Sequence, residues 1–185
     1  GTKTVPPGWR DALLGMLSES TSHPELTVAA IRTVRALPFP KEGDAALVAA
    51  LQRIASSDDV PATTRIEAIA GLPAGTRIGE VEFSTLREAL QPSRTPTEKL
   101  AAANAASRLR FDPAQLQRFA PTLATAGPLE LPRLFVAFAA GGEESLGKAV
   151  LSAIQANPSL RAIRPDDLKP QLAKFPESIR QAADA

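Results

Sequence analysis

Apolar residues recur along this chain at helical spacing, and one apolar pair returns at a regular interval in the mid-thirties of positions. Within residues 61–72, Ile66 and Ile69 stand three positions apart, so they share one face of a helix. Equivalent pairs precede and follow them at nearly equal steps: Ile31 and Val34, Leu100 and Ala103, and Leu134 and Ala137, with Leu168 one further step along. The pattern predicts one equivalent helix in each of several successive units.

A second set of apolar positions repeats with the same period between these helices. Two series share the steps 34, 35 and 33: Leu14, Val48, Phe83 and Leu116, and Leu17, Leu51, Leu86 and Phe119, with Ala153 one further step along. Each unit is therefore predicted to contain two helices. A two-helix repeat with a period in the mid-thirties is typical of an α-solenoid, in which stacked hairpins bury one continuous core.

Prolines, glycines and capping residues divide the chain into short helices. Pro24 and Pro61 open helices, Gly71 ends one, and Pro121 is expected to kink another. Residues 95–98, Thr-Pro-Thr-Glu, form a predicted capping box, and Asp112 with the proline after it caps the next helix. The predicted helices cover residues 9–17, 24–37, 45–55, 61–71, 82–90, 99–108, a segment after 112, 128–138, 143–156, 165–174 and 176–183.

The predicted fold is therefore all-α: a right-handed α-α superhelix of about five helical hairpins. No run of alternating Val or Ile residues is long enough to indicate a strand. We expect residues 1–8 to be a disordered lead-in and residues 9–185 to be one solenoid domain. Its units are predicted near 9–42, 43–79, 80–111, 112–142 and 143–185.

The units resemble HEAT repeats, of the short HEAT-like kind. The tetratricopeptide pattern needs a Tyr, which this chain lacks, and the ankyrin Thr-Pro-Leu-His signature is missing. In HEAT-like families an acidic residue of the hairpin turn stands six positions before a basic residue of the second helix. Asp59 and Arg65 match that spacing.

The basic position of this resemblance recurs in two later units, but its acidic partner does not. Lys99 and Arg133 each stand immediately before the repeating Leu of the second helix, as Arg65 does before Ile66. At the acidic position of these two units stand Ser93 and Gly127. The predicted ladder of turn acids and helix bases is therefore partial.

The last third of the chain shows a second resemblance. Residues 131–183, from LPRLFVAFAAGG to PESIRQAA, resemble the helical segment of large planctomycete and verrucomicrobial proteins that are similar to membrane-associated dehydrogenases. In those proteins the segment stands before a c-type haem domain. The resemblance implies an accessory segment of such a protein and an extracytoplasmic, periplasmic location. The haem attachment motif Cys-x-x-Cys-His is absent, because these 185 residues contain no Cys.

Composition narrows the possible functions. The formal net charge is +1, which argues against a nucleic-acid partner, although a local basic patch is compatible with it. No apolar run approaches the roughly 18 residues of a membrane-spanning helix. With one His and no Cys, the sequence offers no His-based triad and no Cys-ligated metal site, so we predict no catalytic, cofactor or metal residues. The chain begins Gly-Thr-Lys, so we expect a fragment of a longer chain.

Five residues are candidates for a binding surface. Arg65, Lys99 and Arg133, here called the basic row, are predicted to align along stacked second helices and to face an acidic partner, with Asp59 beside them. The alternative is a structural ladder that joins one unit to the next. Asn104 lies at the edge of an inner helix face, where armadillo-type solenoids use Asn to hold an extended peptide; a polar neighbour in an Ala-rich helix is the alternative.

Four further arginines lie at or near predicted helix ends, where cations favour the helix dipole: Arg32, Arg35, Arg108 and Arg110. The leading functional hypothesis is a non-catalytic protein-interaction, scaffold or spacer module of a larger multidomain protein. Its partner would be another protein or a neighbouring domain. The alternatives are a nucleic-acid-binding HEAT-like module, as in alkylated-base repair glycosylases, and the accessory segment of a haem-c dehydrogenase-like protein.

Overall fold

The computed structural model describes residues 5, 7–37, 44–162 and 165–184, and these residues form helices and their connections. The all-α prediction is confirmed: within the described residues there is no strand, only one isolated bridge between Arg77 and Arg110. The predicted lead-in ends earlier than expected, because the first helix begins at Pro7. Residues 1–4 and 6 of that lead-in lie outside the described residues.

Eleven α-helices and two 3-10 helices follow one another along the described chain. The α-helices are α1 (Pro7–Ser18), α2 (Pro24–Ala36), α3 (Ala45–Ser56), α4 (Ala62–Gly71), α5 (Glu80–Ala89), α6 (Pro96–Ala106), α7 (Pro113–Phe119), α8 (Leu131–Val136), α9 (Glu144–Gln155), α10 (Pro165–Leu172) and α11 (Glu177–Asp184). The 3-10 helices are η1 (Ala120–Thr125) and η2 (Pro158–Ala162).

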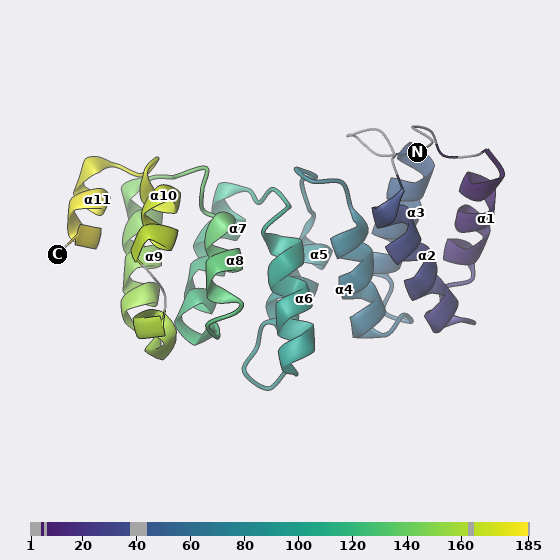
Figure 1. Ribbon diagram of the computed structural model, residues 1–185, viewed down its shortest axis with the longest axis horizontal. Helices are drawn as coiled ribbons and strands as arrows, with labels where there is room; N and C mark the ends of the chain where they lie inside the picture. The colour runs from purple at the N-terminus through teal and green to yellow at the C-terminus, as the bar shows by residue number, and fades with distance from the viewer. Residues whose placement is uncertain (1–4, 6, 38–43, 163–164, 185) are drawn as a thin grey trace.

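The helices stand side by side in a row with α1 at one end and α11 at the other (Figure 1). In the first half, α1 and α2 contact each other, as do α3 and α4. Helices two apart in the chain also meet: α1 contacts α3, α2 contacts α4, and α3 contacts α5. The next-but-one contacts continue through α4–α6, α6–α8, α7–α9, α8–α10 and α9–α11. The even-numbered helices thus form one stacked series, and the odd-numbered helices form another, in which α5 and α7 meet through Phe83 and Phe119.

The starts of these helices follow from their capping residues. The Asp44 carboxylate accepts hydrogen bonds from the N–H groups of Ala46 and Leu47 at 3.0 and 3.2 Å, which begins α3. The predicted capping box at 95–98 is confirmed: Thr95 Oγ1 accepts from the Glu98 N–H at 3.3 Å, and Glu98 Oε2 accepts from the Thr95 N–H at 3.0 Å. These bonds satisfy backbone donors that have no partner within the helix.

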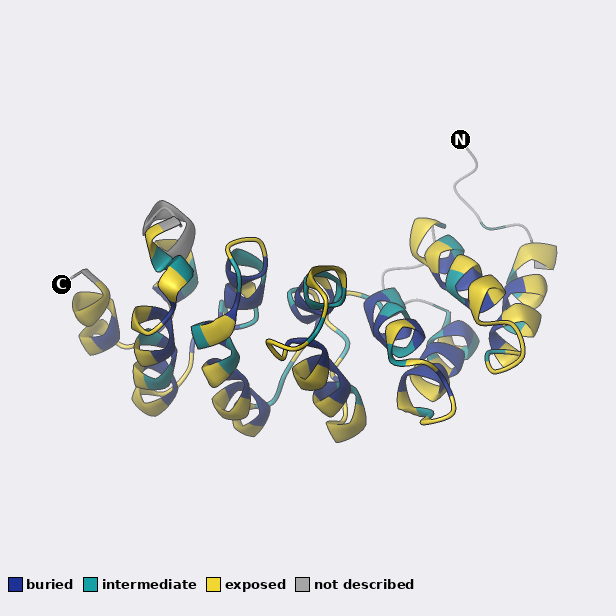
Figure 2. Cartoon of the chain, turned by 90° about the horizontal axis from the view of Figure 1, so that it is seen from below, coloured by how far each residue is buried: buried dark blue, intermediate teal, exposed yellow. Residues whose placement is uncertain are grey.

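The repeating apolar positions mostly lie in the core between the two series (Figure 2). The predicted pairs of α2 and α4 are buried, as is the second series from Leu17 to Phe119. Leu14, Val48, Leu100 and Ala137 are only half-buried, and the side chain of Leu168 lies outside the described residues. In α6 the buried residues are four alanines: Ala102, Ala103, Ala105 and Ala106. Such small side chains allow α4 and α8, both of which α6 contacts, to approach closely.

Four phenylalanines connect the middle of the row. The Phe119 ring packs against Phe83 at 6.1 Å, Phe111 at 5.0 Å and Phe138 at 6.1 Å between ring centroids. Phe83 also meets Phe111 edge-on at 6.1 Å. Phe83 lies on α5, Phe119 ends α7 and Phe138 follows α8, so this aromatic cluster joins two successive hairpins.

The fourth hairpin departs most from the predicted helices. The segment after 112 forms only the seven residues of α7 and then continues as η1, with Pro121 near its start. The predicted helix 128–138 is shortened to Leu131–Val136, with turns on either side. Proline lacks the N–H that an α-helix needs at an interior position, so the chain tightens at Pro121 instead of kinking within one helix.

A buried asparagine anchors η1 to the following hairpin. Asn157 is 3% exposed, and its amide nitrogen donates to the carbonyls of Leu123 and, at 2.9 Å, Ala126. Its amide oxygen accepts the Ser159 N–H at 2.6 Å. Asn157 therefore supplies hydrogen-bond donors to two carbonyl groups in and just after η1. These carbonyls need such donors because they are buried away from water.

Candidate functional site

The basic row occupies equivalent positions on three helices of the even series. Arg65, Lys99 and Arg133 lie in the first four residues of α4, α6 and α8. Since α6 contacts both α4 and α8, the three residues follow one another along the row. Among the described residues no acid is shared between them, and each has different local surroundings.

Arg65 is tied to its own hairpin turn. Its side chain is 16% exposed, and Nη1 lies 3.2 Å from the carboxylate of Asp58. The ion pair therefore uses Asp58 and not Asp59, the residue that the HEAT-like spacing singled out. Asp59 is exposed. The buried Nε of Arg65 has no hydrogen-bond partner among the described residues.

The other candidate residues from the sequence make fewer contacts with charged or polar side chains. The Arg133 guanidinium donates to the carbonyl of Leu129, one turn earlier. Lys99 is half-buried and has no ion pair within the part of the chain that the structure describes. Asn104 is exposed on α6, where its backbone carbonyl accepts the Ser107 hydroxyl at 2.9 Å. The structure thus places the basic row at equivalent positions of α4, α6 and α8 and leaves Asn104 exposed on α6.

The four arginines expected to act on helix dipoles make specific contacts. Arg32 and Arg35 both bind Glu67, with N–O distances of 3.0 and 3.3 Å, and so connect α2 to α4. Arg108 Nη1 donates to the Ala70 carbonyl at 3.2 Å. Arg110 takes part in the bridge to Arg77 through its backbone. The side-chain contacts of Arg32, Arg35 and Arg108 each join two hairpins, which is a role that sequence position alone did not indicate.

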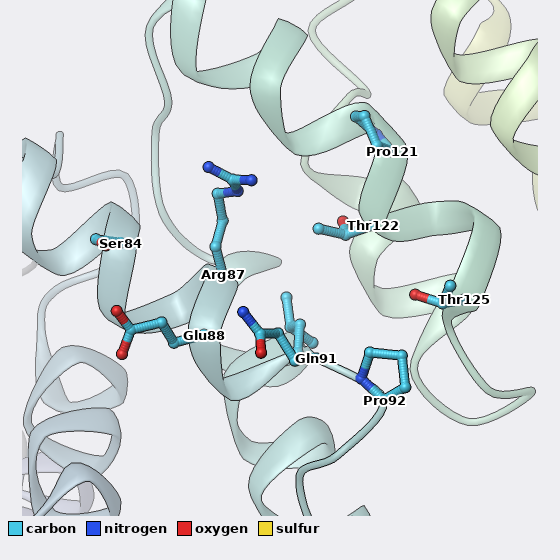
Figure 3. A pocket seen from close by; sticks show the side chains of 9 residues that line it. Ser84, Arg87, Glu88, Gln91, Pro92, Pro121, Thr122 and Thr125 are labelled. Carbon is cyan, nitrogen blue, oxygen red and sulfur yellow. The ribbon is translucent and has the colours of Figure 1, made fainter.

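A pocket of about 400 Å³ opens between α5 and η1, and we call it the α5–η1 pocket (Figure 3). One wall is the C-terminal half of α5 with the residues after it, and the other wall is η1. Its lining residues are Ser84, Arg87, Glu88, Leu90, Gln91, Pro92, Pro121, Thr122 and Thr125. The volume lies within the usual range of ligand pockets in proteins.

The short α7 explains why the pocket opens at this place. The helix ends at Phe119, and the chain continues as η1 with Pro121 in its first turn. The C-terminal half of α5 therefore faces a 3-10 segment where its series would otherwise continue as an α-helix. The aromatic cluster fills the neighbouring part of the contact between the hairpins, since Phe83 and Phe119 are fully buried.

Two arginines flank the ring of Phe83, and they differ in their partners. The Arg118 guanidinium carbon lies 4.7 Å from the ring centroid, and that of Arg87 lies 5.7 Å from it. Both distances are within the range of cation–π attraction. Arg118 Nη2 also binds both carboxylate oxygens of Glu80, at 2.6 and 2.8 Å, and this contact holds the pKa of Glu80 below its usual value. The Arg87 side chain has no ion pair or hydrogen bond with another described residue.

The side chains around the pocket are mainly polar. Figure 3 shows Arg87 and Gln91 extending from α5 and its C-terminal turn, with Thr122 and Thr125 on the opposite wall, whereas the Glu88 carboxylate points away from the space between the walls. The Thr122 hydroxyl donates to the Phe119 carbonyl at 2.6 Å, so its oxygen can still accept a hydrogen bond.

The sequence interpretation missed this pocket. The sequence contains one weak signal of it, a short segment between two prolines, Pro113 and Pro121. The hydrophobic pattern locates core positions and carries no information on where a neighbouring helix fails to extend.

The chain was compared with models of known protein families, with curated proteins and with solved structures, and none of the three comparisons gave a match. In the part of the chain that the structure describes, no three His, Cys, Asp or Glu side chains stand together as metal ligands would. No helix of this part is both long and apolar enough to span a lipid bilayer.

Proposed function

We propose that this chain is a non-catalytic protein-interaction or spacer module of a larger multidomain protein, built as a right-handed, HEAT-like α-solenoid of about five hairpins. The regular two-helix period in the sequence supports the repeat. The next-but-one helix contacts support the stacking. In such an array each hairpin needs its neighbours to bury its apolar face.

The observation that carries the proposal is the open row of helices itself. The two ends of the described row lie far apart, and the helices between them share a continuous core (Figures 1 and 2). A row of this kind offers a long lateral surface for its size and holds whatever is joined to its ends at a fixed separation. Both properties suit binding and spacing of other protein parts.

Internal ion pairs occupy several of the arginines, which restricts the surfaces available to a partner. Arg10 binds Asp44 at 2.7 Å, Arg32 and Arg35 bind Glu67, and Arg118 binds Glu80. Among the described cations without such partners, Lys99 belongs to the basic row and Arg87 lines the α5–η1 pocket. These two places are the binding surfaces that the proposal favours.

Affinity capture followed by calorimetry tests this function. The wild-type chain is used as bait in extracts of its source cells, and each captured protein is purified and titrated against the chain. We expect at least one partner that binds saturably at a 1:1 ratio and that is not displaced by nucleic acid. The proposal fails if purified candidates show no saturable binding and the chain instead turns over a substrate present in the extract.

Nucleic-acid binding is a second candidate, and one observation favours it. Arg77 and Arg110 are paired across a parallel bridge, with the N–H of Arg110 donating to the Thr76 carbonyl at 2.9 Å. The bridge brings the backbones of these two exposed arginines side by side, so both can contribute positive charge to this part of the surface. Binding of an oligonucleotide whose affinity falls steeply with salt, and falls further in R77A/R110A, would support this candidate.

The nature of the larger protein is a separate proposal that rests on the resemblance of residues 131–183. We propose that it is similar to the haem-c dehydrogenase-like proteins, with this chain as an accessory segment. The neighbouring gene sequence tests it directly. A secretion signal upstream and a Cys-x-x-Cys-His motif downstream are expected, and flanks with neither would exclude it.

A further inference from the structure

We propose that the α5–η1 pocket binds the carboxylate side chain of an extended acidic protein segment, and that Arg87 is the anchoring cation. This inference deepens the proposed function, on which it rests, by naming the site and the class of partner. Three observations support it. Arg87 has no acidic partner among the described residues, the opposite wall presents threonine hydroxyl groups, and the Glu88 carboxylate points away from the space between the walls.

The Arg87 side chain is exposed, and no acid among the described residues pairs with its guanidinium group. Its guanidinium carbon lies over the Phe83 ring, 5.7 Å from the ring centroid. Contact with a ring face leaves the N–H donors at the edge of the guanidinium plane available. A carboxylate can accept two of these donors at once in the geometry that arginine favours.

The other arginine beside the same ring shows what Arg87 lacks. Arg118 binds Glu80 through both carboxylate oxygens, at 2.6 and 2.8 Å, while it also lies over Phe83. The chain thus already contains one arginine–phenylalanine–carboxylate arrangement around this ring. A ligand carboxylate beside Arg87 would complete a second one.

The rest of the pocket fits a peptide backbone better than a compact anion. Gln91 provides donors and acceptors on the α5 side, and Thr122 and Thr125 provide hydroxyl groups on the η1 side (Figure 3). An extended peptide presents N–H and C=O groups in alternation, which suits such a mixed lining. The volume of about 400 Å³ is ample for a few residues.

Charge and shape argue against a nucleic acid in this pocket. Of its lining residues only Arg87 is a cation. A phosphate backbone requires several cations along its path, and unpaired bases stack on exposed aromatic rings. Phe83 is 1% exposed, so its ring is covered.

Nuclear magnetic resonance titration with two peptide pools tests the inference. Each pool contains short peptides of equal length made of Gly, Ala, Ser and Thr, with Glu at a central position in one pool and Gln in the other. The probes are the side-chain amide of Gln91 and the backbone amides of Thr122 and Thr125. A deoxythymidine strand of the same length is titrated in parallel.

The matched control is Arg53, which stands one repeat before Arg87 and, like it, in the last turn of an odd-series helix. We expect the Glu pool to shift the three probes and the Gln pool to bind at least tenfold more weakly. The R87A variant should weaken binding of the Glu pool about tenfold or more, as loss of a charge-assisted hydrogen bond does, and R53A should leave it unchanged. R87K, which retains the charge, should fall between wild type and R87A.

Three results would overturn the inference: equal shifts by the two pools, unchanged binding by a folded R87A, or tighter binding of the deoxythymidine strand at the same probes. Circular dichroism shows whether each variant is folded, and R87K keeps the test decisive if R87A is not. If the Glu pool shifts only residues outside the pocket, the pocket assignment fails while the interaction function stands. If the calorimetric search also yields no partner, the proposed function itself fails.

Discussion

Replacement of Phe119 by Leu should destabilise the chain more than an equally buried Phe→Leu replacement elsewhere. Phe119 is fully buried and packs against three other rings, with centroids at 5.0, 6.1 and 6.1 Å. Leu retains most of the apolar contact area and removes the ring–ring geometry. The loss of stability in Phe119→Leu beyond that of a Phe→Leu replacement without ring contacts therefore measures the aromatic contacts that join the third and fourth hairpins.

The magnitude follows from the number of ring contacts. Each aromatic pair contributes about 0.5–1.5 kcal/mol beyond the burial of area. Three pairs that share one ring are not independent, so we expect Phe119→Leu to lower the free energy of unfolding by about 1.5–3 kcal/mol more than a Phe→Leu replacement without ring contacts. Phe119→Ala, which also leaves a cavity, should cost about 3–5 kcal/mol.

Phe135 provides the control. It is also fully buried, on α8, and makes no ring contact with another described aromatic residue. A hydrophobic replacement of similar volume there should cost less than about 1.5 kcal/mol. The assay is equilibrium unfolding in urea, followed by circular dichroism. The free energies of unfolding of wild type, F119L and F135L are compared with one common dependence on urea concentration, the m-value. If F135L costs as much as F119L, the aromatic cluster is not the joint between these hairpins.

Three further replacements test the irregular parts of the fold in the same assay. Asn157→Ala should lower the free energy of unfolding by about 2–4 kcal/mol, because two backbone carbonyls lose their buried donor; a loss under about 1 kcal/mol would contradict this. The pKa of Glu98 lies below its ordinary 4.5 because the Thr95 hydroxyl and N–H donate hydrogen bonds to its carboxylate. The difference in the free energy of unfolding between wild type and Glu98→Gln should therefore be constant at neutral pH and shrink as the pH falls below 4.5. A difference that grew in acid would contradict this prediction. Gly75→Ala should cost about 1–2 kcal/mol, because at φ +83° a side chain is strained, while the new methyl group would make only an ordinary contact with Arg110 Nε at 3.7 Å. Gly141→Ala should cost more, because at φ +77° its methyl group would also stand 2.5 Å from a backbone carbonyl oxygen; equal costs would show that this contact is relieved.

The helical class and the positions of most core residues could be predicted because they depend on local periodicity. Ile66, Ile69 and Leu51 are buried where the repeat places them. Starts of helices were also predictable where a capping residue determines them, as at Thr95. These features arise from interactions between residues three or four positions apart, which a single sequence records directly.

The contacts of the charged side chains could not be predicted, since they depend on the exact rotation of neighbouring helices. The HEAT-like spacing pointed to Asp59, and Arg65 instead pairs with the adjacent Asp58. A shift of one position along a turn moves a carboxylate far enough to decide whether an ion pair forms. The contacts of Arg32 and Arg35 with Glu67 join separate hairpins and depend on the stacking of α2 on α4.

The α5–η1 pocket was beyond sequence reasoning for a related reason. Pro121 indicated a disturbance in the helix but not that the chain would continue as η1. The pocket exists because α7 is shorter than its neighbour α5. To predict it, the lengths of helices in two successive hairpins would have to be compared. Arg87 belongs to an ordinary amphipathic pattern until the wall opposite it is known.

Photo-crosslinking in the source cells tests the central claim, that a protein partner binds at the α5–η1 pocket, most directly. A photoreactive amino acid replaces Thr125, which is exposed on the η1 wall, and in a separate variant replaces Arg53 on α3. The expected result is a crosslink from position 125 to one acidic segment of a protein, lost in R87A, with none from position 53. Crosslinks of equal yield from both positions, or a crosslink from position 125 that persists in R87A, would contradict it.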